Sequence, residues 1–363
     1  MVNNEKFFSS FIIPPGETLQ EVLDDRNMSQ KDLAFRTGLT PKHINNIIKG
    51  NSSISPDTAV KFESVLDTPA SFWINLESDF QENISRIKSL ENIDKEKEVA
   101  QKFPYTLLEK KGWIEKTKDL TERVINLRKY FRVASLEVIA ISQDVNFRKS
   151  EFFQAEDYSV ISWLNESERR SERINTEPFN KKELILIVPE MRKLTTVPLK
   201  ASLPKLVQYC SSVGIALVVT PSIDKTHLNG ATKWLSKDKV MVAISPRGGY
   251  EDIFWFTFFH ELGHVLQEKK NSYFIDVDVE QAEPTQLEKE ADQYAIETLM
   301  STKEYTKFTK IDFTNLAEIR KMAETLKIDM GIIIGRLMKD GYLNYGDKKY
   351  QQFRKKLPLT LNN

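Results

Sequence analysis

His260, Glu261 and His264 have the residue types and the spacing of a hydrolytic metal site. They lie in the run Trp255 to Leu266, which is apolar on almost every side and holds no proline, so we expect a helix that is buried on most of its surface. Residues four apart in a helix lie one turn above each other, so the two imidazoles face the same way and can bind one metal ion. The glutamate beside them is placed to take a proton from a water at that metal. The pattern predicts metal-assisted hydrolysis of a peptide bond.

A histidine pair on a surface helix beside a solvated glutamate would give the same short pattern without any metal. Two observations favour the metal site. The chain has only four histidines, and two of them fall in register on an apolar helix. A second helical run rich in carboxylates, Leu287 to Ala295, follows them.

This second run offers the third protein ligand that a catalytic zinc needs beside one open position for water. We expect that ligand to be Glu288. Asp292 lies four residues further on, on the same face, where its carboxylate can accept the outer ring N–H of a ligating histidine and fix its tautomer. Glu290 is the rival ligand, but it faces away from Glu288 and has Tyr294 rather than a carboxylate four residues on.

At these residues the chain resembles the ImmA/IrrE-type metallopeptidases. The matching stretches are His260 to His264, Glu288 to Ala295 and Leu299-Met300. The resemblance extends over about Leu203 to Tyr345. The second motif of that family usually reads Glu-x-Glu-Ala-Asn-x-Phe-Ala. Here Asp292 replaces the asparagine and Tyr294 the phenylalanine, and neither change removes a ligand.

The resemblance implies a zincin-like domain in which His260, His264 and Glu288 bind Zn²⁺, or another divalent metal such as Mn²⁺, and in which Glu261 activates water. It also implies that the substrate is a protein such as a repressor or an antitoxin.

A second pattern, near the start of the chain, is typical of a helix-turn-helix. Ser29 is expected to cap a helix from Gln30 to Arg36. Thr37-Gly38-Leu39 makes the turn, and Thr40 caps a helix from Pro41 to Gly50. The second helix of such a pair enters the major groove of DNA.

The apolar side chains of this pattern are expected to pack inward, and they are Ala34, Leu39, Ile44 and Ile47. The polar residues left to face outward and contact DNA are Thr40, Lys42, His43, Asn45, Asn46 and Lys49. Asparagine can read adenine edges with two hydrogen bonds, while lysine and threonine contact phosphates or bases. No acidic residue occurs from Arg36 to Pro56, although the formal net charge of the whole chain is +0, so the basic patch is local.

Around this pattern the chain resembles the HigA-type antitoxins of the Xre helix-turn-helix class, over about Pro14 to Phe80. The matching residues are Pro15-Gly16-Glu17, Ser29 to Ala34, Gly38-Leu39-Thr40, then Ile47, Lys49 and Gly50, Ile54 to Ala59, and Phe72 to Leu76. The resemblance implies that double-stranded operator DNA is a partner. It also implies a homodimer, formed through the N-terminal domain, that reads a palindrome.

The chain has the composition of an ordinary soluble protein, with 363 residues of which 40% are hydrophobic and 29% charged. We expect a helix-turn-helix domain at 1–82, a helical connector at 83–200 and a metallopeptidase domain at 201–363. Cys210 lies among apolar residues and is expected to be a buried structural thiol. No apolar run approaches the roughly 18 residues of a membrane span and no secretory signal is recognisable, so we expect no membrane contact and a cytoplasmic location.

After Pro204, three short runs predict strands at 214–219, 231–235 and 239–245, the last two paired through a turn. The fold class expected is therefore α+β, predominantly helical. An open edge of the sheet could align an extended substrate beside the metal. The basic residues near the C-terminal end are expected to be solvated, and they are Lys348, Lys349, Arg354, Lys355 and Lys356.

Together these patterns predict a DNA-binding transcriptional regulator fused to a zinc-dependent endopeptidase. The alternative is an antitoxin or repressor whose peptidase-like half senses a metal or a partner without catalysis. The intact set of ligands and Glu261 favours the first. A donor that stabilises the oxyanion is also expected, and His227, Tyr250 and Tyr294 are candidates for it.

Overall fold

The structure, a computed structural model, describes residues 13–139, 157–223, 226, 228–268, 274–277, 285–308 and 314–358. Its described elements are mostly helices with one small sheet, which confirms the predicted α+β class. The chain divides into two compact units, one of Met1–Ala100 with Lys118–Ile125 and the other of Gln101–Thr117 with Asn126–Asn363. The domain bounds expected from the sequence stay predictions. Among the described helices, none combines the length and the hydropathy that crossing a membrane requires.

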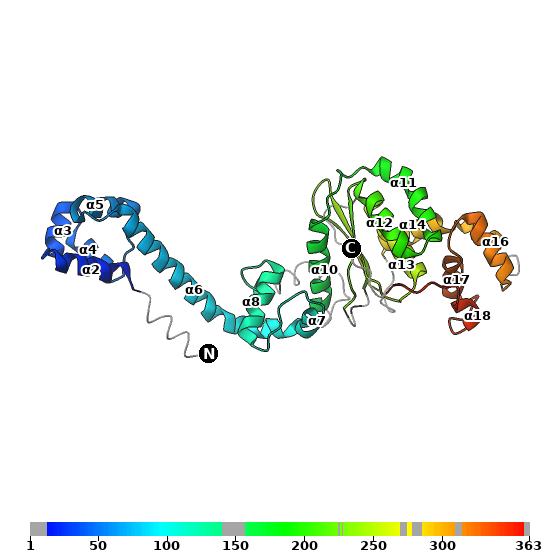
Figure 1. Cartoon of the computed structure of the whole chain (residues 1–363), viewed down its shortest axis with the longest axis horizontal. Helices are drawn as coiled ribbons and strands as arrows, with labels where there is room; N and C mark the ends of the chain where they lie inside the picture. The colour runs from blue at the N-terminus through cyan, green and yellow to red at the C-terminus, as the bar shows by residue number, and fades with distance from the viewer. Residues whose placement is uncertain are drawn as a thin grey trace. The chain divides into compact units, whose positions relative to one another are not determined.

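The first unit is helical. Its described elements are α2 (Pro15–Asp25), α3 (Gln30–Thr37), α4 (Pro41–Ile48), α5 (Pro56–Leu66) and α6 (Ala70–Lys102), which Figure 1 shows as a long helix. The end of α6, from Gln101, belongs to the second unit. Leu33, Ile44 and Ile47 of the middle helices are buried together with Phe62 and Trp73. The ring of Phe62 meets that of Trp73 edge-on, with centroids 5.5 Å apart. This core fixes α3 and α4 against α5 and the start of α6.

Local signals set the helix ends in this unit. The Ser29 side chain accepts a hydrogen bond from the Asp32 N–H, and the Thr40 side chain accepts one from the His43 N–H, as the N-caps predict. Gly38 ends α3 in the left-handed region at φ +68°. The second helix is shorter than predicted, because α4 ends at Ile48 and Gly50 takes up φ +70°.

The second unit contains the sheet and most of the helices. Its described helical elements are α7 (Tyr105–Lys110), α10 (Asp157–Glu172), α11 (Lys181–Lys193), η1 (Leu194–Thr196), α12 (Leu199–Ser211), α13 (Glu251–Gln267), α14 (Gln286–Leu299), α15 (Thr302–Phe308), α16 (Leu316–Leu326), α17 (Met330–Lys339) and α18 (Lys348–Gln351). α8 (Leu120–Phe131) is divided between the two units.

The sheet has four described strands. They are β1 (Ile215–Val219), β2 (Leu228–Trp234), β3 (Val240–Ile244) and β4 (Phe274–Val277), in the spatial order β1-β3-β2-β4. β1 is parallel to β3, while β2 is antiparallel to both β3 and β4. The three predicted strands are present and the last two pair as predicted. β4 could not be predicted, because its short run contains an aspartate and shows no alternation long enough to signal a strand.

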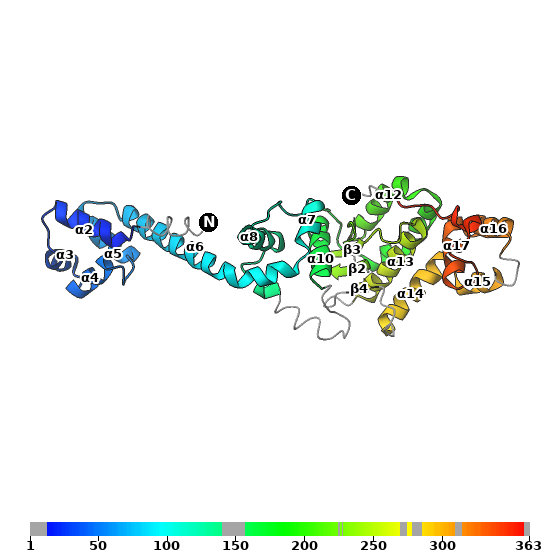
Figure 2. The same ribbon diagram turned by 90° about the horizontal axis from the view of Figure 1, so that it is seen from below.

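Helices cover both faces of this sheet. Figures 1 and 2 show α10 on one side of the strands and α12 and α13 on the other. Alternate residues of each strand serve the two faces, so Leu217 and Val242 join the core with α12 and α13. On the opposite side the Trp163 indole N–H of α10 donates to the Thr220 carbonyl oxygen at 3.1 Å, just after β1. The sheet therefore supports α13 on one face and α10 on the other.

The chain near its C-terminal end is bound to the start of α13. The Arg354 guanidinium forms a buried ion pair with the Asp252 carboxylate, at 2.7 Å between Nη2 and Oδ2. The Leu357 N–H donates to the Gly249 carbonyl oxygen at 2.9 Å. The expectation of a solvated basic end is therefore wrong for Arg354, because its charge is paired in the interior with a carboxylate that the sequence pattern could not assign to it.

The α10 contact gives a stability prediction. Trp163→Phe removes the indole donor from a fully buried site and leaves the Thr220 carbonyl without that bond. We expect the free energy of unfolding to fall by about 1–3 kcal/mol. Urea unfolding followed by far-ultraviolet circular dichroism measures this, with Tyr345→Phe at an exposed position as the control. Equal midpoints for both variants would contradict this account of the contact.

Candidate metal centre and DNA-facing helix

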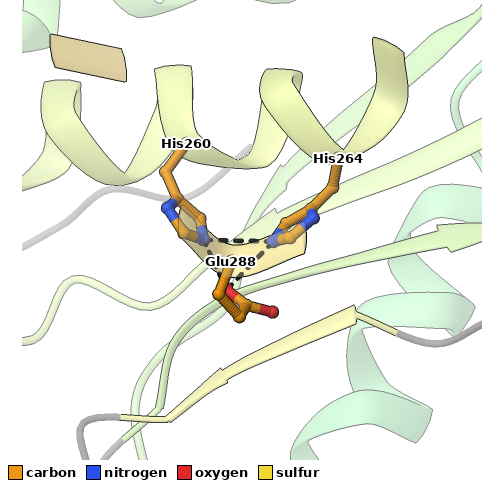
Figure 3. Close-up of side chains that lie close together, drawn as sticks. All are labelled: His260, His264 and Glu288. Atoms are coloured by element: carbon orange, nitrogen blue, oxygen red, sulfur yellow. Dashed lines mark hydrogen bonds and ion pairs between the residues drawn. The ribbon is translucent and has the colours of Figure 1, made fainter. Parts of the chain in front are cut away.

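The helix α13 is buried along most of its length and carries both histidines. Phe258, Phe259 and Leu262 anchor it in the core, and His260 and His264 are themselves almost fully buried. Figure 3 shows the two imidazoles extending from the same side of the helix. Their Nε2 atoms lie 3.1 Å apart. The spacing of four residues therefore brings the two nitrogens to one point.

The helix α14 brings Glu288 to the same point. The Glu288 Oε2 atom lies 3.2 Å from the Nε2 atom of His260 and 3.2 Å from that of His264. Among the described residues these three form a group whose ligand atoms lie within 4.8 Å of one another. Glu290, the rival ligand, is exposed and does not belong to this group. The structure thus brings together the three residues expected to be ligands.

The close approach of α14 to α13 depends on small residues. A Cβ added at Gly263 would lie 2.8 Å from the Ala291 Cα atom, a distance that real Cβ atoms do not reach. Gly263 therefore allows the two helices to pack closely at the level of the histidines.

The C-terminal end of α14 is held by two arginines. The Arg192 side chain donates to the Leu299 carbonyl oxygen at 3.1 Å, and the Arg336 side chain donates to that of Met300 at 2.7 Å. Cations at a helix C-terminus satisfy its last carbonyls and complement the helix dipole.

The geometry of this triad fits a tetrahedral metal ion. Ligand atoms at the zinc distances of nitrogen and oxygen are separated from one another by about 3.3 Å in a tetrahedron. The three separations here are 3.1, 3.2 and 3.2 Å. The donor set of two imidazoles and one carboxylate is one that catalytic zinc uses, with a fourth position for water or substrate.

The outer ring nitrogen of each histidine has a partner that orients the ring. The Nδ1 atom of His260 lies 2.9 Å from the Asp292 Oδ1 atom, as expected from the sequence. Since a carboxylate only accepts, Nδ1 carries a proton, so in the neutral ring the lone pair that a metal needs is on Nε2. The Nδ1 atom of His264 lies 3.1 Å from the Gln267 Oε1 atom, and the Gln267 side-chain N–H donates to the Leu287 carbonyl oxygen at 2.8 Å.

Gln267 was missed by the sequence analysis. Its position three residues after His264 places it on the same face of the helix, which is the signal that could have found it. It orients the ring of His264 and joins it to the main chain of α14 next to Glu288.

The electrostatics of the triad favour a cation. Burial raises the pKa of the Glu288 carboxyl, but hydrogen bonds from His260 and His264 outweigh this effect and lower the pKa to about 2. For His264, burial lowers the pKa, while the hydrogen bond with Glu288 and the charge of Glu261 raise it, and the net shift is upward. The ionised carboxylate is therefore stabilised by positive charge at the imidazoles, which a bound metal would supply in place of a proton.

Glu261 lies on the side of α13 that faces β2. Its carboxylate is fully buried, and its Oε2 atom accepts a hydrogen bond of 2.6 Å from the Thr232 hydroxyl. Gly230 lies against the other carboxylate oxygen. Neither residue was proposed from the sequence. A glycine inside a strand often marks a place where another part of the molecule comes close, and this signal could have identified Gly230. The sequence contains no comparable signal for Thr232.

Two of the three oxyanion candidates, Tyr250 and Tyr294, lie among the described residues, and the contacts that the structure gives them are with residues outside the triad. His227 lies outside the described residues. The Tyr250 ring lies under the Arg354 guanidinium, 4.2 Å from its carbon to the ring centroid. Burial raises the pKa of Tyr294, and its hydroxyl bonds to Thr298. The oxyanion donor stays a prediction.

The residues expected to contact DNA lie along α4 and its ends. Thr40, Lys42 and Lys49 are exposed, and His43, Asn45 and Asn46 are half-buried. The opposite side of the helix carries the buried Ile44 and Ile47. The Thr40 hydroxyl already accepts the His43 N–H as the helix cap, so it serves the fold as well.

Comparison with known families supports both halves of the chain. Residues 19–73 match the helix-turn-helix family, and residues 223–338 match the M78 peptidase family, described as the IrrE N-terminal-like domain. These matches confirm the resemblance to a helix-turn-helix of the Xre type and to the IrrE-type peptidases. The chain combines a helix-turn-helix domain of transcriptional regulators with a domain of a peptidase family.

Individual relatives match a smaller part of the chain. The uncharacterised helix-turn-helix-type transcriptional regulator YddM of Escherichia coli is 28% identical over 64 residues, which cover 18% of this chain and 68% of that protein. A HigA-family addiction module antidote protein from Coxiella burnetii is 32% identical, over 23% of this chain and 92% of that one, with a TM-score of 0.22. PA4674 from Pseudomonas aeruginosa, solved with its operator DNA, is 32% identical over 20% and 80%, with a TM-score of 0.20.

The contact between Gln267 and His264 leads to a prediction on metal affinity. Gln267→Leu keeps the size of the side chain but removes the acceptor of the His264 Nδ1–H. The zinc dissociation constant should rise about 10- to 100-fold, as when other partners of ligating histidines are removed. Competition with a coloured chelator measures it. Gln293→Leu, at an exposed position of α14, is the matched control, and an equal affinity of the two variants would refute the role of Gln267.

Proposed function

We propose that this chain is a DNA-binding transcriptional regulator that carries a zinc-dependent endopeptidase acting on a repressor or antitoxin-type protein. The observation that supports it most is the convergence of the His260 and His264 Nε2 atoms with the Glu288 Oε2 atom at 3.1–3.2 Å. The neighbouring Glu261 is hydrogen-bonded to the Thr232 hydroxyl. The M78 peptidase match over residues 223–338 supports the same reading.

The roles in the reaction follow from these contacts. His260, His264 and Glu288 would hold Zn²⁺, which when bound lowers the pKa of water and polarises the scissile carbonyl. Asp292 and Gln267 keep the two Nε2 lone pairs directed at that position. Glu261 accepts the proton of the attacking water and delivers it to the leaving amine. The burial of the Glu261 carboxylate excludes bulk water from this proton transfer.

The DNA-binding half of the proposal assigns contacts with an operator to Thr40, Lys42, His43, Asn45, Asn46 and Lys49. It is supported by the helix-turn-helix match over residues 19–73 and by the exposed polar side of α4. We propose that the chain acts in the cytoplasm as a homodimer joined through this domain, because such domains read palindromic sites as dimers.

A second candidate is a repressor whose peptidase-like half binds metal without catalysis. The two candidates share the metal and the DNA contacts and differ only in the need for Glu261. A domain that only senses metal does not need a general base beside that metal. The hydrogen bond between Glu261 and Thr232 therefore favours the endopeptidase.

The first test removes the general base. Glu261→Gln keeps the shape of the side chain and all three ligands, so the protein should retain one zinc per chain. Proteolysis should slow by about 10²- to 10⁴-fold, the usual contribution of a general base. The measurement is a quantitative proteome comparison that finds proteins depleted in cells carrying the intact chain and not in cells carrying the variant.

His260→Ala serves as the control for this test, since it should lose both zinc and proteolysis. Depletion of the same proteins at the same rate by intact chain and Glu261→Gln would refute the endopeptidase.

A separate test addresses the DNA-facing helix. The double variant Lys42→Ala/Asn46→Ala removes one phosphate or base contact and one base-reading amide from α4. Its dissociation constant for a duplex selected from a random-sequence pool should rise by about 10-fold or more, the equivalent of one good base contact. Fluorescence anisotropy measures this. Lys88→Ala, at an exposed position of α6, is the control, and an unchanged affinity of the double variant would exclude α4 as the recognition helix.

A further inference from the structure

The strand β2 presents two residues to the carboxylate of Glu261. Gly230 and Thr232 are two apart, so they lie on the same face of the strand, the face that α13 covers. The Thr232 hydroxyl oxygen lies 2.6 Å from the Glu261 Oε2 atom. The same hydroxyl is 3.3 Å from the Glu261 main-chain oxygen, and its single proton is better used on the nearer, charged acceptor.

Burial makes this hydrogen bond important for the orientation of the carboxylate. The side chains of Glu261 and Thr232 are both fully buried. A carboxylate removed from water is costly unless donors compensate for its lost hydration. The Thr232 hydroxyl is such a donor, and its bond fixes the direction in which that carboxylate oxygen points.

Gly230 leaves space for the other oxygen of the Glu261 carboxylate. A Cβ at this position would lie 2.3 Å from the Glu261 Oε1 atom, closer than any real contact. The atom it would meet is the end of a flexible side chain and not main chain, so a methyl group here would displace the carboxylate and leave the strand in place. Thr232 and Gly230 therefore define the position of both carboxylate oxygens.

The strand that carries Gly230 and Thr232 is paired on both sides. Thr232 pairs with Val242 of β3 on one side and with Phe274 of β4 on the other. A strand bonded along both edges cannot shift easily, so the hydroxyl is held at a fixed place relative to α13.

We propose that Thr232 is a positioning residue that holds the Glu261 carboxylate in the orientation in which it can accept a proton, with Gly230 as the space that this orientation needs. The inference rests on the proposed endopeptidase. It assigns to β2 a part in proton transfer that goes beyond support of the helix. Within the part of the chain that the structure describes, the Thr232 hydroxyl bonds to Glu261 and to none of the three candidate ligands, so we expect its loss to affect Glu261 and to leave zinc binding intact.

Three variants test the assignment, with Glu261→Gln as the reference. Thr232→Val keeps the shape and removes the hydroxyl, Thr232→Ser keeps the hydroxyl, and Gly230→Ala fills the space. All three should bind one zinc per chain. Thr232→Val and Gly230→Ala should deplete the cellular substrates about 100-fold more slowly, the cost of a small misplacement of a catalytic group, while Thr232→Ser should stay near the intact rate.

A structural readout accompanies the rates. Crystal structures of the zinc-loaded variants should show the Glu261 carboxylate turned away in Thr232→Val and in its original place in Thr232→Ser. Rates of Thr232→Val or Gly230→Ala equal to that of the intact chain would overturn the proposal, and so would a Thr232→Ser variant as slow as Thr232→Val. If Glu261→Gln itself is fully active, the endopeptidase fails, and this result is distinct from a failure of the positioning role alone.

Discussion

The contact of α13 with α14 at Gly263 and Ala291 is the constraint on which the candidate centre depends. The two histidines need only one helix to come together, because a spacing of four residues suffices. Glu288 comes from a different helix, and its Oε2 atom reaches 3.2 Å from both Nε2 atoms only because the absence of a side chain at Gly263 lets the helices approach. The position of the third candidate ligand is thus a product of tertiary packing.

The rest of the second unit keeps these two helices in place. The buried Asp252–Arg354 ion pair fixes the start of α13, and the sheet supports its buried face. Arg192 and Arg336 hold the end of α14. Removing one partner of a buried ion pair costs about 3–5 kcal/mol, because the other charge is left buried and unpaired, so loss of Asp252 or Arg354 should loosen the start of α13.

The sequence could predict those features that depend on local pattern. The helix caps at Ser29 and Thr40 and the histidine pair all follow from residues within one or two turns of one another. Glu288 and Asp292 followed from their common helix face and from family resemblance, and the structure places both at the histidines.

Features that join distant segments could not be predicted in the same way. Thr232 meets Glu261 across 29 residues of sequence, and Arg354 meets Asp252 across 102. The sequence around each of these residues does not indicate which distant residue it contacts. β4 is a further case, since its four residues become a strand by pairing with β2.

The central claim is that one zinc ion is held by two imidazoles and one carboxylate. X-ray absorption spectroscopy of the full-length, zinc-loaded protein tests it most directly. The account predicts one zinc per chain, nitrogen and oxygen neighbours at about 2.0–2.2 Å and the outer-shell scattering of two imidazole rings. Zinc well below one per chain, or a sulfur neighbour at about 2.3 Å, would contradict it.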